Sequence, residues 1–403
     1  MIILILSMLL SPEFRLGDAP GRAVVLRLED IFLFVVFLGW LARMAINKEL
    51  GFLKKTALNQ PIIVYVSICI VSTLLGAIAG NLNIKTGIFY LLKYLEYFMV
   101  FFMVVNNIRD KNQAKSFIFF LFLTCALVNV YSLMHLGSSM AQRVSAPFEG
   151  KGGEPNTFAA YLILMMALTL GFIIHTQSSQ RRWLFIGLFF LMFIPFVSTL
   201  SRGGWLSFIP MILTLIIMCR RFKLQMIFVF IGFISLSPFL APEKVKARIA
   251  ETFVPDKSYA VLGKHLAIAE SAAARVDSWG IGFKQWAKRP VLGWGIPAGV
   301  VIDNQYTRVL SETGLLGFMA FAWIIITLFS LGRHVYSNFT SDEFAQSVSL
   351  GFMAGLVGLL TMSNTAAVFI LIRVMEPFWF IAAIVVCLFK QPPEGEGSLS
   401  RQE

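Results

Sequence analysis

Runs of about 17 to 20 consecutive apolar residues recur along the whole chain, and they constrain its fold more than any other feature. A helix of that length, rising about 1.5 Å per residue, can cross a hydrocarbon layer roughly 30 Å thick. Each run must be helical, because the lipid interior offers no hydrogen-bond partner to exposed backbone groups. The chain has 403 residues, of which 57% are hydrophobic and only 14% charged. These proportions exclude a soluble globular domain, a secreted disulfide scaffold and a nucleic-acid-binding module.

The apolar runs predict an all-α polytopic membrane protein with about twelve transmembrane helices. In the first half of the chain we place them at residues 1–10, 30–46, 61–80, 87–105, 116–136 and 157–175. In the second half we place them at residues 183–199, 205–218, 224–240, 314–331, 344–362 and 368–389. Residues 1–10 lack a basic leader and a small-residue cleavage site, so we expect a short first span and no removable signal peptide.

Lys and Arg residues gather in every second short connection, after the even-numbered predicted helices. They are Arg43, Lys48, Lys54, Lys55, Arg109, Lys111, Lys115, Arg181, Arg182, Arg220, Arg221, Lys223 and Arg333. Short loops rich in Lys and Arg remain in the cytoplasm, so we expect these connections and both termini to lie inside. The net charge of +12 then reflects membrane orientation and anionic headgroups, and not nucleic-acid binding.

One long loop interrupts the series of short connections. The expected organisation is transmembrane helices one to nine at 1–240, the loop at 241–313, helices ten to twelve at 314–390 and a polar cytoplasmic tail at 391–403. The loop holds ten basic and seven acidic residues. Long loops escape the positive-inside rule, so this excess indicates either a solvated surface or an anionic ligand.

An amphipathic helix is expected within the long loop. Trp279, Phe283 and Trp286 are spaced for one helical face, while Lys284 and Arg289 lie elsewhere on the helix. Such a helix would rest at the membrane surface with its rings at headgroup depth. Simple anchoring without chemistry is the plain alternative.

Four segments place glycine and charged residues at the outer ends of predicted helices. Arg143 begins RVSAPFEGKGGEPNTFAA, and Arg202 lies in the turn SRGG, whose paired glycines let the backbone fold closely. Arg202 could instead simply extend to lipid headgroups. Arg275 begins RVDSWGIGFKQWAKRPVLGWG, and Asp303 begins DNQYTRVLSETGLLG. The predicted topology puts all four residues on one outer face, although they are far apart in the sequence.

Two charged pairs fall inside predicted helices. Lys93 with Glu96, and Arg373 with Glu376, are spaced at i and i+3 and therefore share a helix face. An unpaired charge within the membrane costs several kcal/mol, so we expect each pair to be neutralised and to bind helices together. A functional alternative is that the pairs line a pocket open to the outer side.

The four motifs, in their order along the chain, resemble the bacterial O-antigen ligase and O-antigen polymerase superfamily. They read RVSAPF with EPNTFAAYL, then STLSRGGWLSF, then ARVDSWGIGFKQWAKRPVLGWG, and finally DNQYTRVLSETGLLGF, over about residues 140–320. Each motif alone is common, but four in this order on a polytopic chain with one long outer loop are specific. The resemblance implies a GT-C-like membrane fold, and the first four predicted helices contribute little to it.

This resemblance implies an inverting, metal-independent glycosyltransferase in the bacterial inner membrane, with its active site facing the periplasm and no cofactor. Expected partners are an undecaprenyl-diphosphate-linked glycan donor, a glycan or lipid-linked glycan acceptor and membrane lipids. A chain-length regulator could also take part, and no nucleic acid is expected. In such families outer-loop arginines hold the carrier diphosphate, and Arg143, Arg202 and Arg275 fall on those motifs. Guanidinium groups suit this role, because they stabilise a departing phosphate by paired, charge-assisted hydrogen bonds.

The fourth motif departs from the ligase pattern at Asp303, where ligases that resemble this chain have histidine before the asparagine. An aspartate, with a reference pKa of about 3.9, is a weaker base than a histidine at about 6.5. Asp303 could still orient the acceptor hydroxyl and take its proton late, or it could cap the following helix. The departure slightly favours a polymerase or an exopolysaccharide transferase over a lipid A core ligase.

Further residues are candidates for substrate binding or for the base. Those expected to bind substrate are Asn304, Tyr306, Trp279, Trp286, Lys284, Arg289 and Arg308. Of the four histidines only His265 lies in the long loop, and it is a weak substitute for the missing base. The outer segments contain no His or Cys cluster, so no metal site is expected.

A transporter or flippase for a lipid-linked or other anionic substrate is the rival interpretation. Such a protein would also use outer arginines and intramembrane charges. Transporters, however, favour charges near the membrane midplane and internal repeats. In this sequence the cations gather towards one face and no repeat is visible.

Overall fold

The computed structural model describes residues 1–390 apart from residues 12, 20–21, 47–53, 137–142, 148–152, 220–221, 252–256, 262–263, 269 and 300–301. Its helices confirm a multi-pass, helical membrane protein. Within this described part, eight helices are long and apolar enough to cross a membrane: α3 (Asn59–Ile78), α4 (Ile84–Asn107), α5 (Lys111–Met134), α6 (Pro155–His175), α7 (Ser179–Ser198), α12 (Gln305–Asn338), α13 (Glu343–Met362) and α14 (Ile372–Phe389).

The remaining predicted runs coincide with four further apolar helices. They are α1 (Ile2–Leu10), α2 (Leu28–Ile46), α8 (Arg202–Met218) and α9 (Lys223–Leu240). The nine residues of α1 rise only about 14 Å, which is too short to cross a hydrocarbon layer. The helical class is therefore confirmed, while the count of twelve transmembrane helices stays a prediction.

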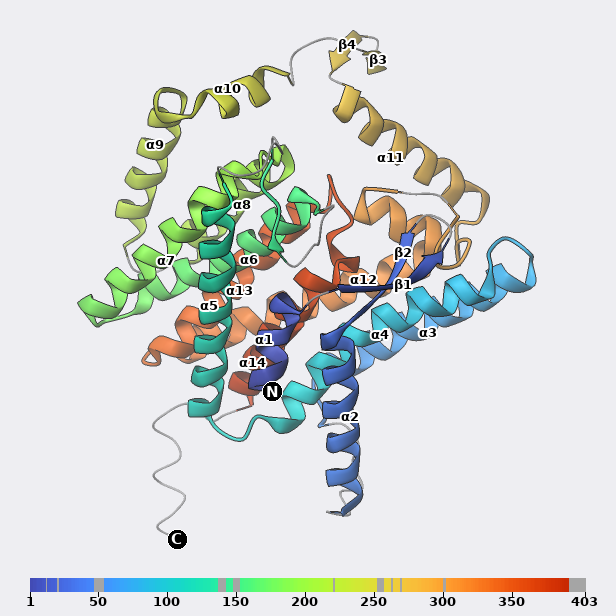
Figure 1. Ribbon diagram of the computed structural model, residues 1–403, viewed down its shortest axis with the longest axis horizontal. Coiled ribbons are helices and arrows are strands. Elements are labelled where there is room, and N and C mark those ends of the chain that lie inside the picture. The colour runs from blue at the N-terminus through green and yellow to red at the C-terminus, as the bar shows by residue number, and fades with distance from the viewer. Residues whose placement is uncertain are drawn as a thin grey trace.

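The core of the bundle consists of α6, α13 and α14, with the other long helices arranged around them (Figure 1). The most apolar stretch of α6 is 89% buried, whereas that of α7 is only 17% buried. α6 and α13 pack in backbone contact, because a Cβ on Gly171 would lie 2.3 Å from the carbonyl oxygen of Ser347. α7 thus has the exposed apolar surface of a helix that faces lipid.

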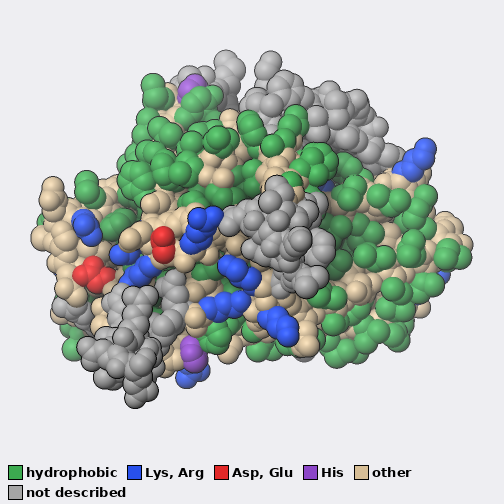
Figure 2. Space-filling model, turned by 90° about the horizontal axis from the view of Figure 1, so that it is seen from below, with side chains coloured by type: hydrophobic (Ala, Val, Ile, Leu, Met, Phe, Trp, Pro, Cys, Tyr) green, Lys and Arg blue, Asp and Glu red, His purple; other side chains and the backbone are tan. Residues whose placement is uncertain are grey.

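One end of the bundle collects the basic connections. Lys54 donates from Nζ to the carbonyl oxygen of Val105, at the end of α4, over 3.2 Å. Lys111, at the start of α5, forms a 2.6 Å ion pair with Asp342, which precedes α13. Figure 2 views the molecule from below and shows Lys and Arg side chains spread across this end. The segments that hold Lys54, Lys111 and Asp342 therefore lie at one end of the bundle.

The long loop contains a hairpin as well as helices. In chain order it holds α10 (Glu243–Ala250), β3 (Lys257–Val261), β4 (Lys264–Ile268) and α11 (Glu270–Lys288), and β3 and β4 pair antiparallel. A second antiparallel hairpin, β1 (Glu13–Ala19) with β2 (Arg22–Arg27), precedes α2. The expectation of short helices alone is therefore incomplete. Both hairpins lie outside the apolar runs, where strands of five to seven residues leave no signal in a search for membrane helices.

α12 begins before the predicted transmembrane start and is broken where that start was expected. Gly314 has a φ of 66° and a ψ of −164°, a left-handed conformation that glycine adopts without steric cost. The break separates a first segment, residues 305–313, from the long apolar part that follows. The long apolar part begins at this break, close to the predicted start at 314, and the prediction missed only the short helix of the outer end that runs directly into it.

The first helix is held by the last. Arg373 on α14 donates from Nη1 to the carbonyl oxygen of Met8 at 2.6 Å and from Nη2 to that of Ser11 at 3.3 Å. The last carbonyl groups of a helix have no partner within the helix, so Arg373 satisfies those of α1. Leu4 and Ile5 of α1 are fully buried. This short helix is therefore an integral part of the bundle.

Candidate functional site

The first two motifs meet at Asn156, in the first turn of α6. Arg143 donates from Nε to the carbonyl oxygen of Thr199 at 3.0 Å and from Nη2 to Oδ1 of Asn156 at 3.4 Å. The hydroxyl of Ser201 donates to the same Oδ1 atom at 2.8 Å. The segment before α6 is thereby joined to the turn before α8, where Arg202 is the first helical residue.

The turn before α8 differs from the prediction for its paired glycines. Leu200 takes the left-handed conformation, with a φ of 50°, and Ser201 caps α8 by accepting from the backbone N–H of Gly204. Gly203 and Gly204 are helical. A Cβ on Gly203 would lie 2.1 Å from Oγ1 of Thr365, in the connection between α13 and α14. The glycines therefore permit close packing, and the prediction that they form the turn is wrong.

Arg275 joins the first two motifs from α11. Burial lowers the pKa of Arg275, the carboxylate of Asp303 opposes this effect, and the charge of Arg248 adds to it. Burial also lowers the pKa of Arg143, and the charges of Arg248 and Arg275 lower it further. Arg202 is within the field of the same two arginines. Together with the hydrogen bonds through Asn156 that join Arg143 to the turn before Arg202, these charge effects show that the structure brings Arg143, Arg202 and Arg275 near one another.

Arg248 is a fourth member of this arginine cluster, and it was not among the residues predicted for the site. It lies on α10 and forms a 2.5 Å ion pair with Glu251. Its charge acts on each of the other three arginines. In the sequence Arg248 is one of ten basic residues in the long loop, and no motif marks it. Only the course of α10 across the end of the bundle, visible in Figure 1, brings it to the site.

Asp303 lies at the edge of the arginine cluster. Its side chain is exposed, and its backbone N–H donates to the hydroxyl of Ser278, one turn after Arg275 on α11, at 3.1 Å. Asn304 caps α12, because its Oδ1 accepts from two backbone N–H groups of the first turn at 2.9 Å each. The alternative that Asp303 caps this helix is therefore wrong, and its carboxylate is open to a ligand.

Three other residues of the fourth motif have structural partners. Asn304 donates from Nδ2 to the carbonyl oxygen of Asn364 at 3.2 Å, and the hydroxyl of Tyr306 donates to a backbone carbonyl of α13 at 2.6 Å. Arg308 is buried, with its Nε 2.9 Å from Oε1 of Glu312. These contacts fix the first segment of α12, while a direct contact of the three residues with substrate stays a prediction.

The aromatic residues of α11 are covered to different degrees, and their anchoring at the membrane surface stays a prediction. Trp279 and Trp286 are half-buried, and only Phe283 is exposed. α11 packs closely on α12, since a Cβ on Gly282 would lie 2.9 Å from that of Thr307. The two indole rings are therefore partly covered by the protein itself, and stacking on a sugar ring stays a prediction for them.

The remaining candidates lie around this site or outside the described atoms. Lys284 is exposed on α11, and the guanidinium carbon of Arg289 lies 4.3 Å from the ring centroid of Trp294. His265 belongs to β4, but its side chain is outside the described part of the structure. Within that described part, no group of three or more His, Cys, Asp or Glu residues could hold a metal ion.

One of the two predicted intramembrane pairs is confirmed. Nζ of Lys93 lies 3.0 Å from Oε2 of Glu96 on α4. Arg373 binds the end of α1, as described above. The Arg373–Glu376 pair stays a prediction, while Arg373 by itself connects α14 to α1.

The family model described as O-antigen ligase matches residues 187–322, about a third of the chain. The matched segment begins in α7 and ends in α12, and it contains the second, third and fourth motifs. No curated protein matches the chain. The family match supports the resemblance that the order of the motifs indicated.

Proposed function

We propose, from the chain's place in the O-antigen ligase and polymerase superfamily, that it is a glycosyltransferase of the bacterial inner membrane. It moves a glycan from an undecaprenyl diphosphate carrier to a sugar hydroxyl at the periplasmic face. The observation that carries the proposal is the convergence of Arg143, Arg202, Arg248 and Arg275 at one end of the bundle. The basic connections at the other end support a periplasmic position for this one.

The leaving group explains why arginines would gather here. Transfer breaks the bond between the anomeric carbon and a phosphate oxygen, and the bonding electrons leave with the diphosphate. A guanidinium group remains charged and offers paired N–H donors that match phosphate oxygens. Each charge-assisted hydrogen bond contributes roughly 1.5 to 3 kcal/mol. Because the donors are already in place, they stabilise the negative charge as it develops, and the proposed reaction needs no metal ion.

Asp303 serves the acceptor in this proposal. Its exposed carboxylate accepts a hydrogen bond from the acceptor hydroxyl, orients the oxygen towards the anomeric carbon and receives the proton as the new bond forms. Attack on the side opposite the diphosphate inverts the anomeric configuration. The charge of Asp303 acts on Arg275, so the base that would serve the acceptor lies beside the arginines that would hold the diphosphate.

Aspartate in place of the ligase histidine slightly favours a polymerase or exopolysaccharide transferase over a lipid A core ligase. In either case the carrier's polyprenyl chain stays in the bilayer while its diphosphate reaches the arginine cluster. α7 has an apolar surface that is largely exposed, as a helix in contact with lipid chains requires.

The first test is glycan transfer by the purified protein in liposomes, with a radiolabelled lipid diphosphate oligosaccharide as donor and the unlabelled oligosaccharide as acceptor. We expect Arg202→Ala to abolish transfer and Arg202→Lys to restore little of it, because an ammonium group cannot form the paired fork. Lys244→Ala is the matched control, since Lys244 is an exposed cation of α10 in the same loop. Normal turnover in both Arg202 variants would remove Arg202 from the mechanism.

The same liposomes separate the enzyme from the rival transporter. Transfer of label to the acceptor with release of carrier diphosphate supports the enzyme. Movement of the labelled lipid across the bilayer without transfer supports a transporter or flippase, and would contradict the proposed function.

A further inference from the structure

The break in α12 is filled by the loop that follows α11. Before the break, the carbonyl groups of Ser311 and Glu312 each accept a 2.9 Å hydrogen bond from a backbone N–H of this loop. Beyond the break, the N–H groups of Leu315 and Leu316 donate to two loop carbonyls at 2.8 and 3.2 Å. Groups left without helical partners are thus satisfied by the loop. The first segment of α12, residues 305–313, is therefore a separate piece that is joined to α11.

That first segment carries the acceptor side of the proposed site. It starts two residues after Asp303, whose N–H is bonded to Ser278 of α11. At its other end, the hydroxyl of Ser311 donates to Oε1 of Gln285, also on α11, at 2.7 Å. Because α11 bears Arg275 as well, the segment and α11 hold Asp303 and Arg275 in one unit.

Glu312 connects this unit to the membrane bundle. Its Oε1 accepts from Nε of Arg308 at 2.9 Å, and its Oε2 accepts from the hydroxyl of Tyr94 on α4 at 3.2 Å. Its carbonyl oxygen accepts from the hydroxyl of Ser72 on α3 at 2.7 Å. The side chain of Glu312 is only 4% exposed. One residue therefore ties the segment to both α3 and α4.

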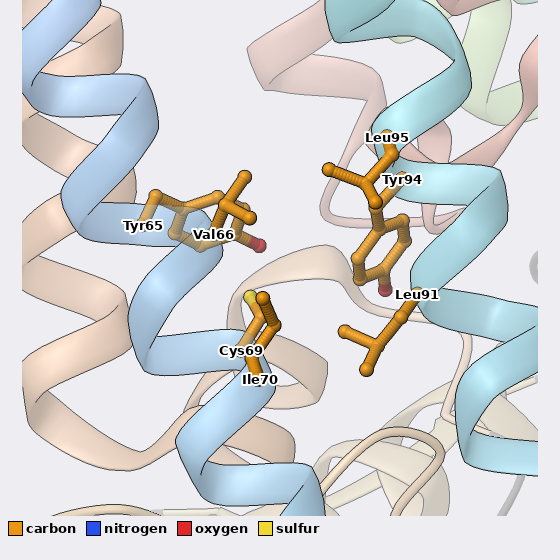
Figure 3. A pocket seen from close by; sticks show the side chains of 7 residues that line it. All are labelled: Tyr65, Val66, Cys69, Ile70, Leu91, Tyr94 and Leu95. Carbon is orange, nitrogen blue, oxygen red and sulfur yellow. The ribbon is translucent and has the colours of Figure 1, made fainter.

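The apolar surroundings of Glu312 limit the positions that the first segment of α12 can take. Figure 3 shows the apolar groove beside Tyr94, where Tyr65 and Cys69 of α3 lie opposite Leu91 and Tyr94 of α4. A charge buried in such a place is costly unless it is paired and hydrogen-bonded. A shift of the segment would separate Glu312 from Tyr94 and Ser72, so these buried contacts favour a single position.

We propose that Glu312 is a positioning residue, which joins the first segment of α12 to α4 through Tyr94 and to α3 through Ser72, while Arg308 of the same segment balances its charge, and which thereby sets where Asp303 lies relative to the arginine cluster. Nine residues separate Glu312 from Asp303, about 14 Å along a helix, so Glu312 acts without touching the substrate. The inference rests on the proposed function for the role of Asp303, but the positioning itself can be measured without any substrate.

The test measures the distance between two spin labels on the purified full chain in lipid nanodiscs. The first pair, Lys85→Cys with Asp303→Cys, joins the start of α4 to the start of the α12 segment, and both sites are exposed. The second pair, Lys85→Cys with Lys115→Cys, joins the same end of α4 to the beginning of α5 and does not involve the α12 segment. The four native cysteines are all buried, so the spin label should react only with the introduced cysteines.

Glu312→Gln keeps the size of the side chain and removes its charge. We expect it to broaden the distance distribution of the first pair and to leave that of the second unchanged. Turnover at saturating donor should fall by about 10²-fold, with the donor KM within about twofold, because a displaced catalytic group slows the reaction more than it weakens binding. Glu312→Gln leaves the buried guanidinium of Arg308 without its carboxylate partner. Adding Arg308→Gln removes that charge and should narrow the distance distribution of the first pair again.

Lys111→Met is the matched control, because it breaks a partly buried 2.6 Å ion pair at the opposite end of the bundle. It should leave both distributions narrow. A Glu312→Gln protein with an unchanged first distribution would overturn the proposal, and so would equal broadening of both pairs, which indicates general loosening. If the distances respond as expected but even the unsubstituted protein transfers no glycan, the proposed function fails and the positioning role of Glu312 stands.

Discussion

Asp303 and Asn304 are neighbours in one motif, yet their side chains have opposite surroundings. Asn304 is 4% exposed and caps α12, whereas Asp303 is exposed beside the arginine cluster. The motif predicted that both residues belong to the site. It could not tell the cap from the base, because Asp and Asn are equally good N-caps. Motif order and topology predicted that Arg143, Arg202 and Arg275 lie near one another. They could not predict Arg248, because nothing in the local sequence distinguishes it from Lys244 or Lys246.

The base assignment can be tested at Asp303 itself. Asp303→Asn keeps the shape and removes the carboxylate, and we expect transfer to fall by about 10²- to 10⁴-fold. Asp303→His supplies a base with a reference pKa near 6.5, so activity should partly return above about pH 6.5 and disappear below it as the imidazole is protonated. The measurement is the initial rate of transfer between pH 5 and 9, with Asp277→Asn as the control. Unchanged rates in both Asp303 variants would exclude a role in proton transfer.

At the scale of helices, small residues decide how closely elements approach. A pair of glycines can form a turn or can allow two helices to pack closely. Only the residue that lies against the pair in the fold shows which of the two roles it has. In SRGG that neighbour is Thr365, more than 160 residues away, so the sequence alone favoured the wrong use. The break at Gly314 was hidden for a similar reason, because its hydrogen-bond partners belong to a loop outside the segment.

The packing role of Gly203 predicts a stability change with a specific rescue. Gly203→Ala would place a Cβ 2.1 Å from Oγ1 of Thr365, and we expect it to destabilise the protein by about 1 to 3 kcal/mol. Adding Thr365→Ala should recover most of that loss by making room. Gly187→Ala on α7 is the control, since nothing lies within 4 Å of the added atom. The measurement is thermal unfolding in detergent, and equal losses with and without Thr365→Ala would contradict this role.

At the scale of the whole molecule, the strongest sequence signal concerned the membrane. Lipid forces every long apolar run into a helix, and each predicted run coincides with one. The distribution of Lys and Arg predicted which connections share an end, as the Lys111–Asp342 pair shows. The two hairpins carry no such signal, because bilayer thickness does not constrain segments outside it.

Topology gives a prediction for the intact protein. A cysteine at Asp303 should react with a membrane-impermeant maleimide in intact spheroplasts, and a cysteine at Lys115 only in inverted vesicles. Lys244→Cys and Lys223→Cys provide a second exposed position at each end. The native cysteines are buried, so background labelling should be low. Reaction of Asp303→Cys and Lys115→Cys from the same side would contradict the orientation on which the arginine site depends.

The bond between Arg373 and Met8 has a consequence for the synthesis of the chain. The two residues are 365 positions apart. At about 5 to 20 residues per second, a ribosome needs roughly 20 to 70 s to make the stretch between them. For all of that time the carbonyl groups that end α1 must find water, lipid headgroups or an insertion factor as substitutes. α1 therefore reaches its final bonding only after Arg373 has been synthesised.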